Sequence, residues 1–177
     1  MRWIWLDRIL ELEKATRCVA IKNVSAAEEV LHDHFEAVPA KDGKPGRDAV
    51  PVMPNSLIIE GMAQTAGILV GHAKDFKEKV ILAKIGKAKF TGAAYPGYTI
   101  RHTAVVDRID EMGAATKGVV ELIDSATGEA SPLAEVELMF SHIDQNRQGL
   151  EFPEENFVFT DQFMDLLRRS GVPTPND

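Results

Sequence analysis

PVMPNSLIIEGMAQTAGILVGH, residues 51–72, is the stretch around which the rest of the sequence is arranged. Its side chains are apolar at nearly every position, which predicts one long helix that is buried on every side. Pro54 precedes the helical residues, and Asn55 or Ser56 is expected to cap them. Gly71 is expected to mark the end of the helix. The fold should therefore be built around a central helix.

Glu60 is the only charged residue between Asp48 and Lys74. A carboxylate on a buried helix is costly unless it stays protonated or finds a partner. Gln64 follows four residues later, on the same helix face. We expect Gln64 either to orient Glu60 or to make hydrogen bonds within the core. The combination makes Glu60 the first candidate for a functional residue.

The composition excludes several classes of protein. A chain of 177 residues has the length of one domain with an appendage, and its net charge of −7 argues against nonspecific nucleic-acid binding. No stretch matches a signal peptide or a membrane span, so a cytoplasmic protein is expected. The single cysteine, Cys18, excludes an internal disulfide and a cysteine-cluster metal site, and it is expected to be a small buried thiol.

Alternating patterns predict strands on both sides of the helix. One strand is expected near residues 17–24, after a short helical turn at the N-terminus. Four more are expected after the helix, separated by the turn sequences YPG, DEMG and DSATGE, at 81–90, 98–110, 114–124 and 132–143. Hairpin spacing favours an antiparallel sheet, so we predict an α+β domain over residues 1–143 in which the sheet wraps around the helix.

Two segments do not fit this pattern. Residues 36–50, EAVPAKDGKPGRDAV, predict an exposed loop, either a tolerated insertion or a lid at the rim of a site. Residues 144–177 predict a C-terminal extension that is acidic at first and then forms a short helix between Thr160 and Gly171. This extension is expected to pack across the domain or across a partner subunit.

Four motifs carry a resemblance to a known family: HDHF (32–35), PVMPNSLIIEGMAQ (51–64), KIGKAKFTGAAYPGYTI (84–100) and AEVELMFSHI (134–143). Together they resemble the 3-hydroxyacyl-[acyl carrier protein] dehydratases of fatty acid biosynthesis, the FabZ and FabA type, which have the hot-dog fold. The positions that match the family pattern are His34, Phe35, Pro54, Leu57, Glu60, Met62, Ala63 and Gln64. The long 36–50 loop and Asn55, in place of the usual glycine, depart from it.

The dehydration that this resemblance implies needs a base, a proton for the departing hydroxyl, and a donor for the thioester oxygen. His34 can act as the base, because imidazole titrates near neutral pH. Glu60 can protonate or hold the hydroxyl. The backbone N–H groups of Asn55 and Ser56 lie at the positive end of the helix and suit a developing oxyanion. No cofactor or metal is needed. A zinc site of His32, His34 and Glu60 is disfavoured because it has too few ligands.

The resemblance also implies an acyl tunnel beside the helix. We assign Phe35, Met53, Leu57 and Met62 to this tunnel, although plain core packing is the alternative for each apolar residue near Glu60. In the family the histidine and the glutamate of one site come from different chains, so a homodimer is expected, or a trimer of such dimers. Six lysines within residues 74–89 would attract an acidic acyl carrier protein.

The sequence thus predicts a cytoplasmic hydro-lyase of lipid metabolism that dehydrates (3R)-3-hydroxyacyl thioesters to trans-2-enoyl thioesters. Two alternatives stay open. One is a hot-dog acyl thioesterase, which would release a free thiol instead of an enoyl thioester. The other is a noncatalytic acyl-binding subunit, for which the loop insertion and the altered Asn55 are the arguments.

Overall fold

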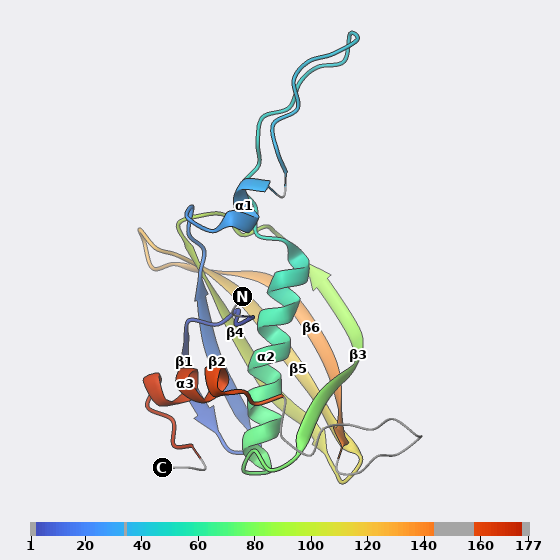
Figure 1. Cartoon of the computed structure of the whole chain (residues 1–177), viewed down its shortest axis with the longest axis vertical. Helices are drawn as coiled ribbons and strands as arrows, with labels where there is room; N and C mark the ends of the chain where they lie inside the picture. The colour runs from blue at the N-terminus through green and yellow to red at the C-terminus, as the bar shows by residue number, and fades with distance from the viewer. Residues whose placement is uncertain (1–2, 34, 144–157, 175–177) are drawn as a thin grey trace.

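The central helix forms as predicted and lies against one face of the sheet (Figure 1). The structure is a computed structural model and describes residues 3–33, 35–143 and 158–174. The central helix, α2, spans Asn55–Ala73, and its buried residues lie on nearly all sides. Pro54 is the N-cap and no side chain caps the helix. The prediction of an Asn55 or Ser56 cap is therefore wrong, because both residues already lie within the first turn.

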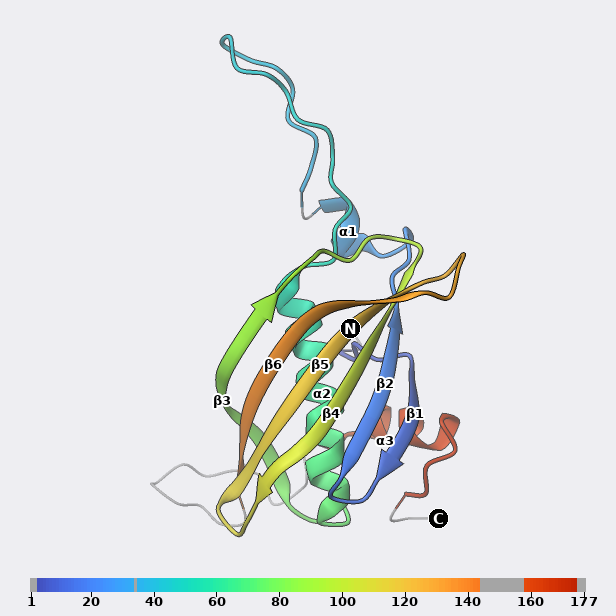
Figure 2. The same ribbon diagram turned by 180° about the vertical axis from the view of Figure 1, so that it is seen from behind.

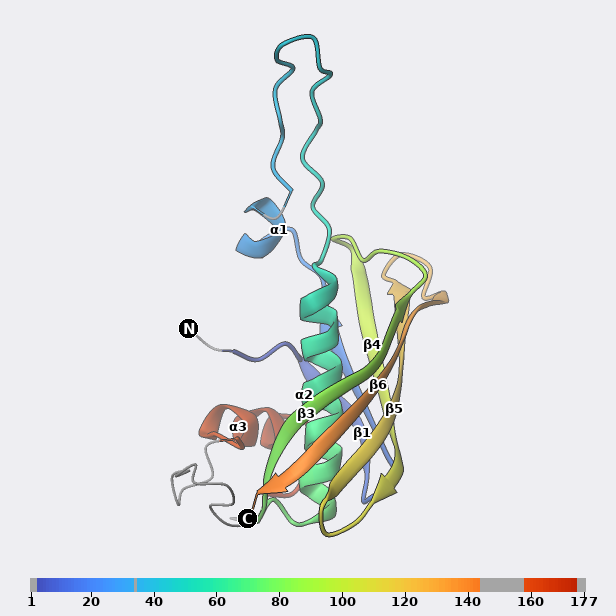
Figure 3. The same ribbon diagram turned by 90° about the vertical axis from the view of Figure 1, so that its right-hand side faces the viewer.

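The sheet has six antiparallel strands in the order β1-β2-β4-β5-β6-β3. It wraps around α2, as Figures 2 and 3 show from behind and from the side. This arrangement confirms the predicted α+β hot-dog fold. The strands are β1 (Arg8–Glu13), β2 (Arg17–Asn23), β3 (Lys79–Phe90), β4 (Tyr98–Ile109), β5 (Gly113–Asp124) and β6 (Ala130–Ile143).

Strand β1 replaces the short helical turn that the sequence predicted at the N-terminus. Its residues pair with β2, with an irregularity between Ile9 and Glu11. Only Ile9 of the strand is fully buried, so the local sequence carries little of the alternation that marks a strand. Pairing with β2 therefore overrides the local preference.

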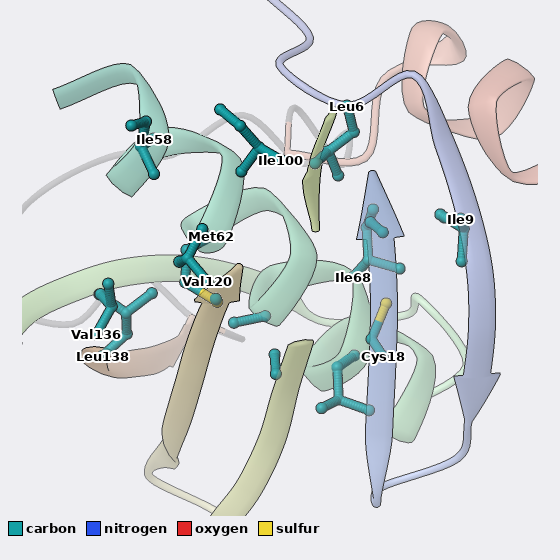
Figure 4. Packing of buried hydrophobic residues seen from close by; sticks show 14 of the residues in the cluster. Leu6, Ile9, Cys18, Ile58, Met62, Ile68, Ile100, Val120, Val136 and Leu138 are labelled. Carbon is teal, nitrogen blue, oxygen red and sulfur yellow. The ribbon is translucent and has the colours of Figure 1, made fainter. Parts of the chain in front are cut away.

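The core lies between α2 and the inner face of the sheet. Ile58, Met62 and Ile68 of α2 belong to one buried cluster with Val120 and Val136 of the strands (Figure 4). The helix and the sheet approach each other closely at Gly118 of β5, where a Cβ atom would lie 2.5 Å from Sδ of Met62.

The only cysteine behaves as the sequence predicted. Cys18 of β2 is fully buried, and burial raises the pKa of its thiol to about 12. The thiol therefore stays protonated and serves as a small apolar group of the core.

Two peripheral segments attach to this domain. A short helix, α1 (Glu29–Asp33), lies near the start of α2, and residues 36–50 form a narrow arm that stands away from the sheet (Figures 1 and 3). Isolated bridges Val38↔Arg47 and Lys41↔Lys44 hold the two sides of the arm together. Its residues are exposed up to Ala49, as predicted. The arm points away from α2 of its own chain.

The C-terminal segment packs back onto the domain. Helix α3 (Asp161–Arg169) starts after Thr160 and is followed by Gly171 with φ of 77°, as the sequence predicted. Leu166 is buried, and the Ile9 backbone N–H of β1 donates to Oγ of Ser170 at 3.0 Å. The acidic residues 144–157 lie outside the described residues.

Two glycines of α2 provide a matched test of this packing. A Cβ atom at Gly61 would lie 2.7 Å from Nε2 of buried His102, whereas one at Gly67 would lie 3.8 Å from its nearest neighbour, Phe140. We expect Gly61→Ala to lower the free energy of unfolding by about 1 to 2 kcal/mol, because overpacking outweighs the gain in helix propensity. Gly67→Ala should raise it by about 0.5 to 1 kcal/mol. Urea unfolding of both variants measures this, and equal effects would contradict the packing described.

Candidate active site

Glu60 lies in the second turn of α2 and is held by two hydrogen bonds. Its Oε1 accepts from Nε2 of Gln64 at 2.8 Å and from the indole Nε1 of Trp3 at 3.1 Å. The side chain is half-buried. Gln64 therefore does orient the carboxylate, as one of the two sequence interpretations proposed. The carboxylate is fixed in place but still reaches the surface of a cavity.

The N-terminal segment completes this arrangement. The backbone N–H of Trp5 donates to Oε1 of Gln64 at 2.9 Å, and Nε2 of Gln64 donates to the carbonyl of Trp3 at 3.2 Å. The two indole rings stack edge to face, with centroids 5.5 Å apart. The role of Trp3 was not predicted. The two tryptophans near the start of the sequence could have drawn attention to this segment, but a local pattern does not reveal a contact with a residue 57 positions away.

A cavity of about 210 Å³ lies beside Glu60. Its walls come from the N-terminal segment, α2, β3, β6 and the C-terminal segment. The lining residues are Trp3, Glu60, Ala63, Gln64, Gly67, Ile68, Val80, Leu82, Phe140, Val158, Phe159 and Phe163. Glu60 is the only ionisable residue among them. The cavity therefore suits an apolar group that carries a polar end near the carboxylate.

The first turn of α2 presents backbone N–H groups at the helix N-terminus, and their role as donors in a site stays a prediction. The N–H groups of Leu57 and Ile58 both bond to the carbonyl of Pro54. Asn55 and Ser56 come before these in the turn, both are exposed, and their N–H groups have no backbone partner within the part of the chain that the structure describes. Glu60 lies about 7.5 Å further along the helix axis. Two polar atoms of one ligand could therefore contact the positive end of the helix and the carboxylate at the same time, with a hydrogen bond of about 3 Å to each.

His34 lies outside the described residues, and so does the side chain of His32. The neighbouring residues place this region near the start of α2: α1 ends at Asp33, and the N–H of Val50 donates to the carbonyl of Phe35 at 2.9 Å. The role of His34 stays a prediction. Among the described residues, no group of three or more side chains is arranged to hold a metal ion.

The four residues assigned to the tunnel lie apart from the cavity beside Glu60. Met53 and Met62 are buried in the core, and Leu57 is half-buried. Phe35 is 39% exposed, and the guanidinium of Arg47 lies over its ring. Their assignment to a tunnel stays a prediction, whereas the lining of the observed cavity was not predicted. Of the sequence-derived site residues, the structure brings Glu60 and Gln64 into contact.

The lysines of residues 74–89 are spread along the whole edge of the sheet. Strand β3 is 12 residues long, about 35 Å from end to end. Lys74, the C-cap of α2, pairs with Glu78 before the strand begins, and Lys87 pairs with Glu135 on β3. The lysines of β3 therefore form a partly neutralised row, and the six lysines do not form one compact patch.

The sheet, the central helix and the helix carboxylate at an apolar cavity define a hot-dog protein with a site on its central helix. A model described as a FabA-like domain matches residues 3–125. The 3-hydroxyacyl-[acyl-carrier-protein] dehydratase FabZ of Thermoanaerobacter sp. (strain X514) is 33% identical over 139 residues, which are 78% of this chain and 85% of that protein. The chain belongs to the 3-hydroxyacyl-[acyl carrier protein] dehydratase family, as the four sequence motifs indicated.

Solved structures support the fold. The dehydratase heterocomplex ApeI:P from Xenorhabdus doucetiae matches with a TM-score of 0.56 and 18% identity, covering 80% of this chain and 84% of that chain. A thioesterase family protein from Silicibacter pomeroyi matches with a TM-score of 0.58 and 12% identity, covering 77% of this chain and 83% of that chain. At these identities the likeness shows the hot-dog fold alone. No helix in the described part of the chain is long and apolar enough to cross a membrane.

His102 of β4 lies beneath α2 against Gly61, and burial lowers its pKa from 6.5 to about 3. The imidazole is therefore neutral in the folded protein and charged in the unfolded chain below pH 6.5. The stability that this difference contributes is present above pH 6.5 and is lost as the pH falls towards 3.

We predict that the free energy of unfolding falls by about 2 kcal/mol more in the wild type than in His102→Leu between pH 7 and pH 5. Urea unfolding at the two pH values measures this difference. Parallel pH dependence of the two proteins would show that His102 is not a buried neutral group.

Proposed function

We propose that this protein removes water from (3R)-3-hydroxyacyl thioesters, carried on acyl carrier protein, to give trans-2-enoyl thioesters in fatty acid biosynthesis. The observation that carries the proposal is the position of Glu60, a fixed carboxylate at an apolar cavity near the α2 N-terminus, where the first N–H groups have no backbone partner among the described residues. Membership of the dehydratase family supports the reaction, and the identity to the FabZ relatives supports the substrate class.

In the proposed reaction a base removes a proton from C2, the C2–C3 double bond forms, and the C3 hydroxyl leaves as water. His34 is proposed as the base. The hydroxyl takes the proton that it needs either from Glu60 or, while Glu60 holds it, from the His34 imidazolium that received the C2 proton. Trp3 and Gln64 keep the Glu60 carboxylate aligned. The N–H groups of Asn55 and Ser56 stabilise the negative charge that develops on the thioester oxygen. The acyl tail enters the apolar cavity, which excludes water from it.

A homodimer is proposed because strand β3 has an open edge. It pairs with β6 on one side only, within the strands that the structure describes, and Leu82 and Ile85 of β3 are exposed. A 12-residue edge strand with apolar side chains favours pairing with another chain. Pairing between two β3 strands would bring a second protomer close to the cavity, because Val80 and Leu82 line it. Such a dimer fits a site shared between protomers.

The partner and the location follow from the proposed reaction. Exposed Lys84, Lys87 and Lys89 along β3 would attract an acidic carrier protein. A cytoplasmic location is proposed from the identity to the FabZ relatives and the proposed reaction on acyl carrier protein. Thioester hydrolysis is the second candidate, because solved structures of the same fold include a thioesterase family protein. The product of the reaction separates the two.

The role of Glu60 is tested by substitution. Glu60→Gln should lower kcat for dehydration by about 10² or more, because the amide can neither give a proton to the leaving hydroxyl nor accept one from it. His34→Ala should have an effect of similar size. Mass spectrometry of the products, with each enzyme at equal concentration, measures the loss of water.

Ser56→Ala is the matched control, because it changes an exposed side chain at the site and keeps the backbone N–H. Its rate should stay near that of the wild type. Wild-type rates in Glu60→Gln would contradict the assignment, and a free thiol without enoyl product would favour the thioesterase.

The dimer is tested at the open edge of β3. Ile85→Arg should shift the protein towards monomer, because it places a charge on the proposed interface. Val119→Arg changes a similarly exposed apolar residue on central strand β5 and should leave the dimer intact; the two side chains are 45% and 47% exposed. Sedimentation velocity measures both, and dimers that persist in Ile85→Arg would contradict pairing through β3.

A further inference from the structure

We infer that the C-terminal segment 158–163 closes the far end of the cavity beside Glu60 and sets the length of acyl chain that the protein accepts. The inference rests on the proposed function for the identity of the ligand, an acyl thioester. It assigns a role in substrate selection to a segment that lies beyond the residues matched by the family model, 3–125. The limit on acyl length would thus come from a part of this protein outside the match to the family model.

One wall of the cavity is a stripe along α2. Glu60, Ala63 and Gly67 occur at spacings of three and four residues, so they lie above one another on one face of the helix. Ala63 and Gly67 leave space beside the helix backbone, where larger side chains would fill the cavity. The stripe leads from the carboxylate away from the α2 N-terminus. An acyl chain whose hydroxyl meets Glu60 therefore has an apolar path along this face.

The path ends at phenylalanine rings from the C-terminal segment. A Cβ atom at Gly71 would lie 2.2 Å from Cζ of Phe159, so this ring lies directly on α2 at that position. Phe159 is buried and meets Phe76 edge to face, with ring centroids 5.0 Å apart. Phe163 lies in the first turn of α3, and its ring centroid is 6.5 Å from that of Phe159. The two rings form an end wall that α2 alone lacks.

Packing of α3 holds this wall in place. Leu166 and Leu167 are almost fully buried, and Oγ of Ser170 accepts a hydrogen bond from Ile9 of β1. Phe163 itself is only half-buried and faces the cavity. Phe163 also packs against the core, so shortening its ring leaves the buried leucines and the Ser170 hydrogen bond to anchor α3.

The dimensions limit the acyl chain. Gly67 lies about 10 Å and Gly71 about 16 Å from Glu60 along the helix axis. The cavity of about 210 Å³ holds about seven groups the size of a water molecule or a methylene, at about 30 Å³ each. A chain with more than about seven carbons beyond C3 would overfill this cavity, whose lining includes Phe159 and Phe163. The preferred substrates are therefore of short to medium length.

The experiment removes the Phe163 ring and measures the length profile. Dehydration of 3-hydroxyacyl thioesters from four to sixteen carbons is compared for the wild type, Phe163→Ala and Phe163→Leu. We expect kcat/KM for the chains of twelve to sixteen carbons to rise at least about tenfold relative to that for six carbons in Phe163→Ala. The milder Phe163→Leu should shift the profile in the same direction and covers the case in which the alanine variant does not fold.

Met164→Ala is the matched control, because Met164 is also half-buried on α3 but does not line the cavity. Its length profile should equal that of the wild type. A second readout does not depend on turnover. Saturated acyl thioesters of the same lengths are titrated into variants that also carry Trp5→Phe, and quenching of Trp3 fluorescence measures their affinity. The affinity for long acyl chains should rise in the Phe163 variants.

The outcomes separate the two proposals. An unchanged length profile in both Phe163 variants, in binding and in turnover, would overturn the inference while leaving dehydration standing. A shifted binding profile without any enoyl product would keep the length limit and overturn the proposed reaction.

Discussion

Close contact between α2 and the sheet is the constraint on which the other features depend. Gly61 of the helix lies against His102 of β4, and Gly118 of β5 lies against Met62 of the helix, at distances that leave no room for a Cβ atom. The two contacts let the helix and the sheet approach closely. In this arrangement Ile58 and Met62 point into the core (Figure 4), and Glu60 lies on the side that the sheet leaves open.

The open side of α2 is then covered by the two ends of the chain. The N-terminal segment brings Trp3 and Trp5 to Glu60 and Gln64, and the C-terminal segment brings Phe159 to Gly71. The first contact holds the carboxylate, and the second closes the cavity beside it. Helix α3 is anchored on β1, so both ends meet on the same side of the molecule (Figure 3). The helix carries Glu60, whereas the two ends of the chain line the space around this carboxylate.

The parts of the structure that depend on local patterns could be predicted from the sequence. The apolar stretch around Glu60 predicted α2, and alternation and turn sequences predicted the later strands. The four-residue spacing predicted that Gln64 lies on the same helix face as Glu60, and their contact was one of two interpretations. The features that failed or were missed depend on distant contacts. Strand β1 forms because it pairs with β2, and Trp3 reaches Glu60 from 57 residues away. The cavity lining could not be predicted for the same reason, since Phe159 and Phe163 meet α2 only after α3 has docked on the sheet.

We propose that a fixed carboxylate on α2 acts on the hydroxyl of a substrate whose acyl tail lies in the cavity beside it. This can be tested by a crystal structure of Glu60→Gln with a bound 3-hydroxyacyl pantetheine thioester of eight carbons. We expect the C3 hydroxyl within hydrogen-bond distance of residue 60, the thioester oxygen at the N–H groups of Asn55 and Ser56, and the tail directed towards Phe163. A thioester bound with its tail outside this cavity, or with its hydroxyl remote from residue 60, would show that Glu60 and the cavity do not form the substrate site.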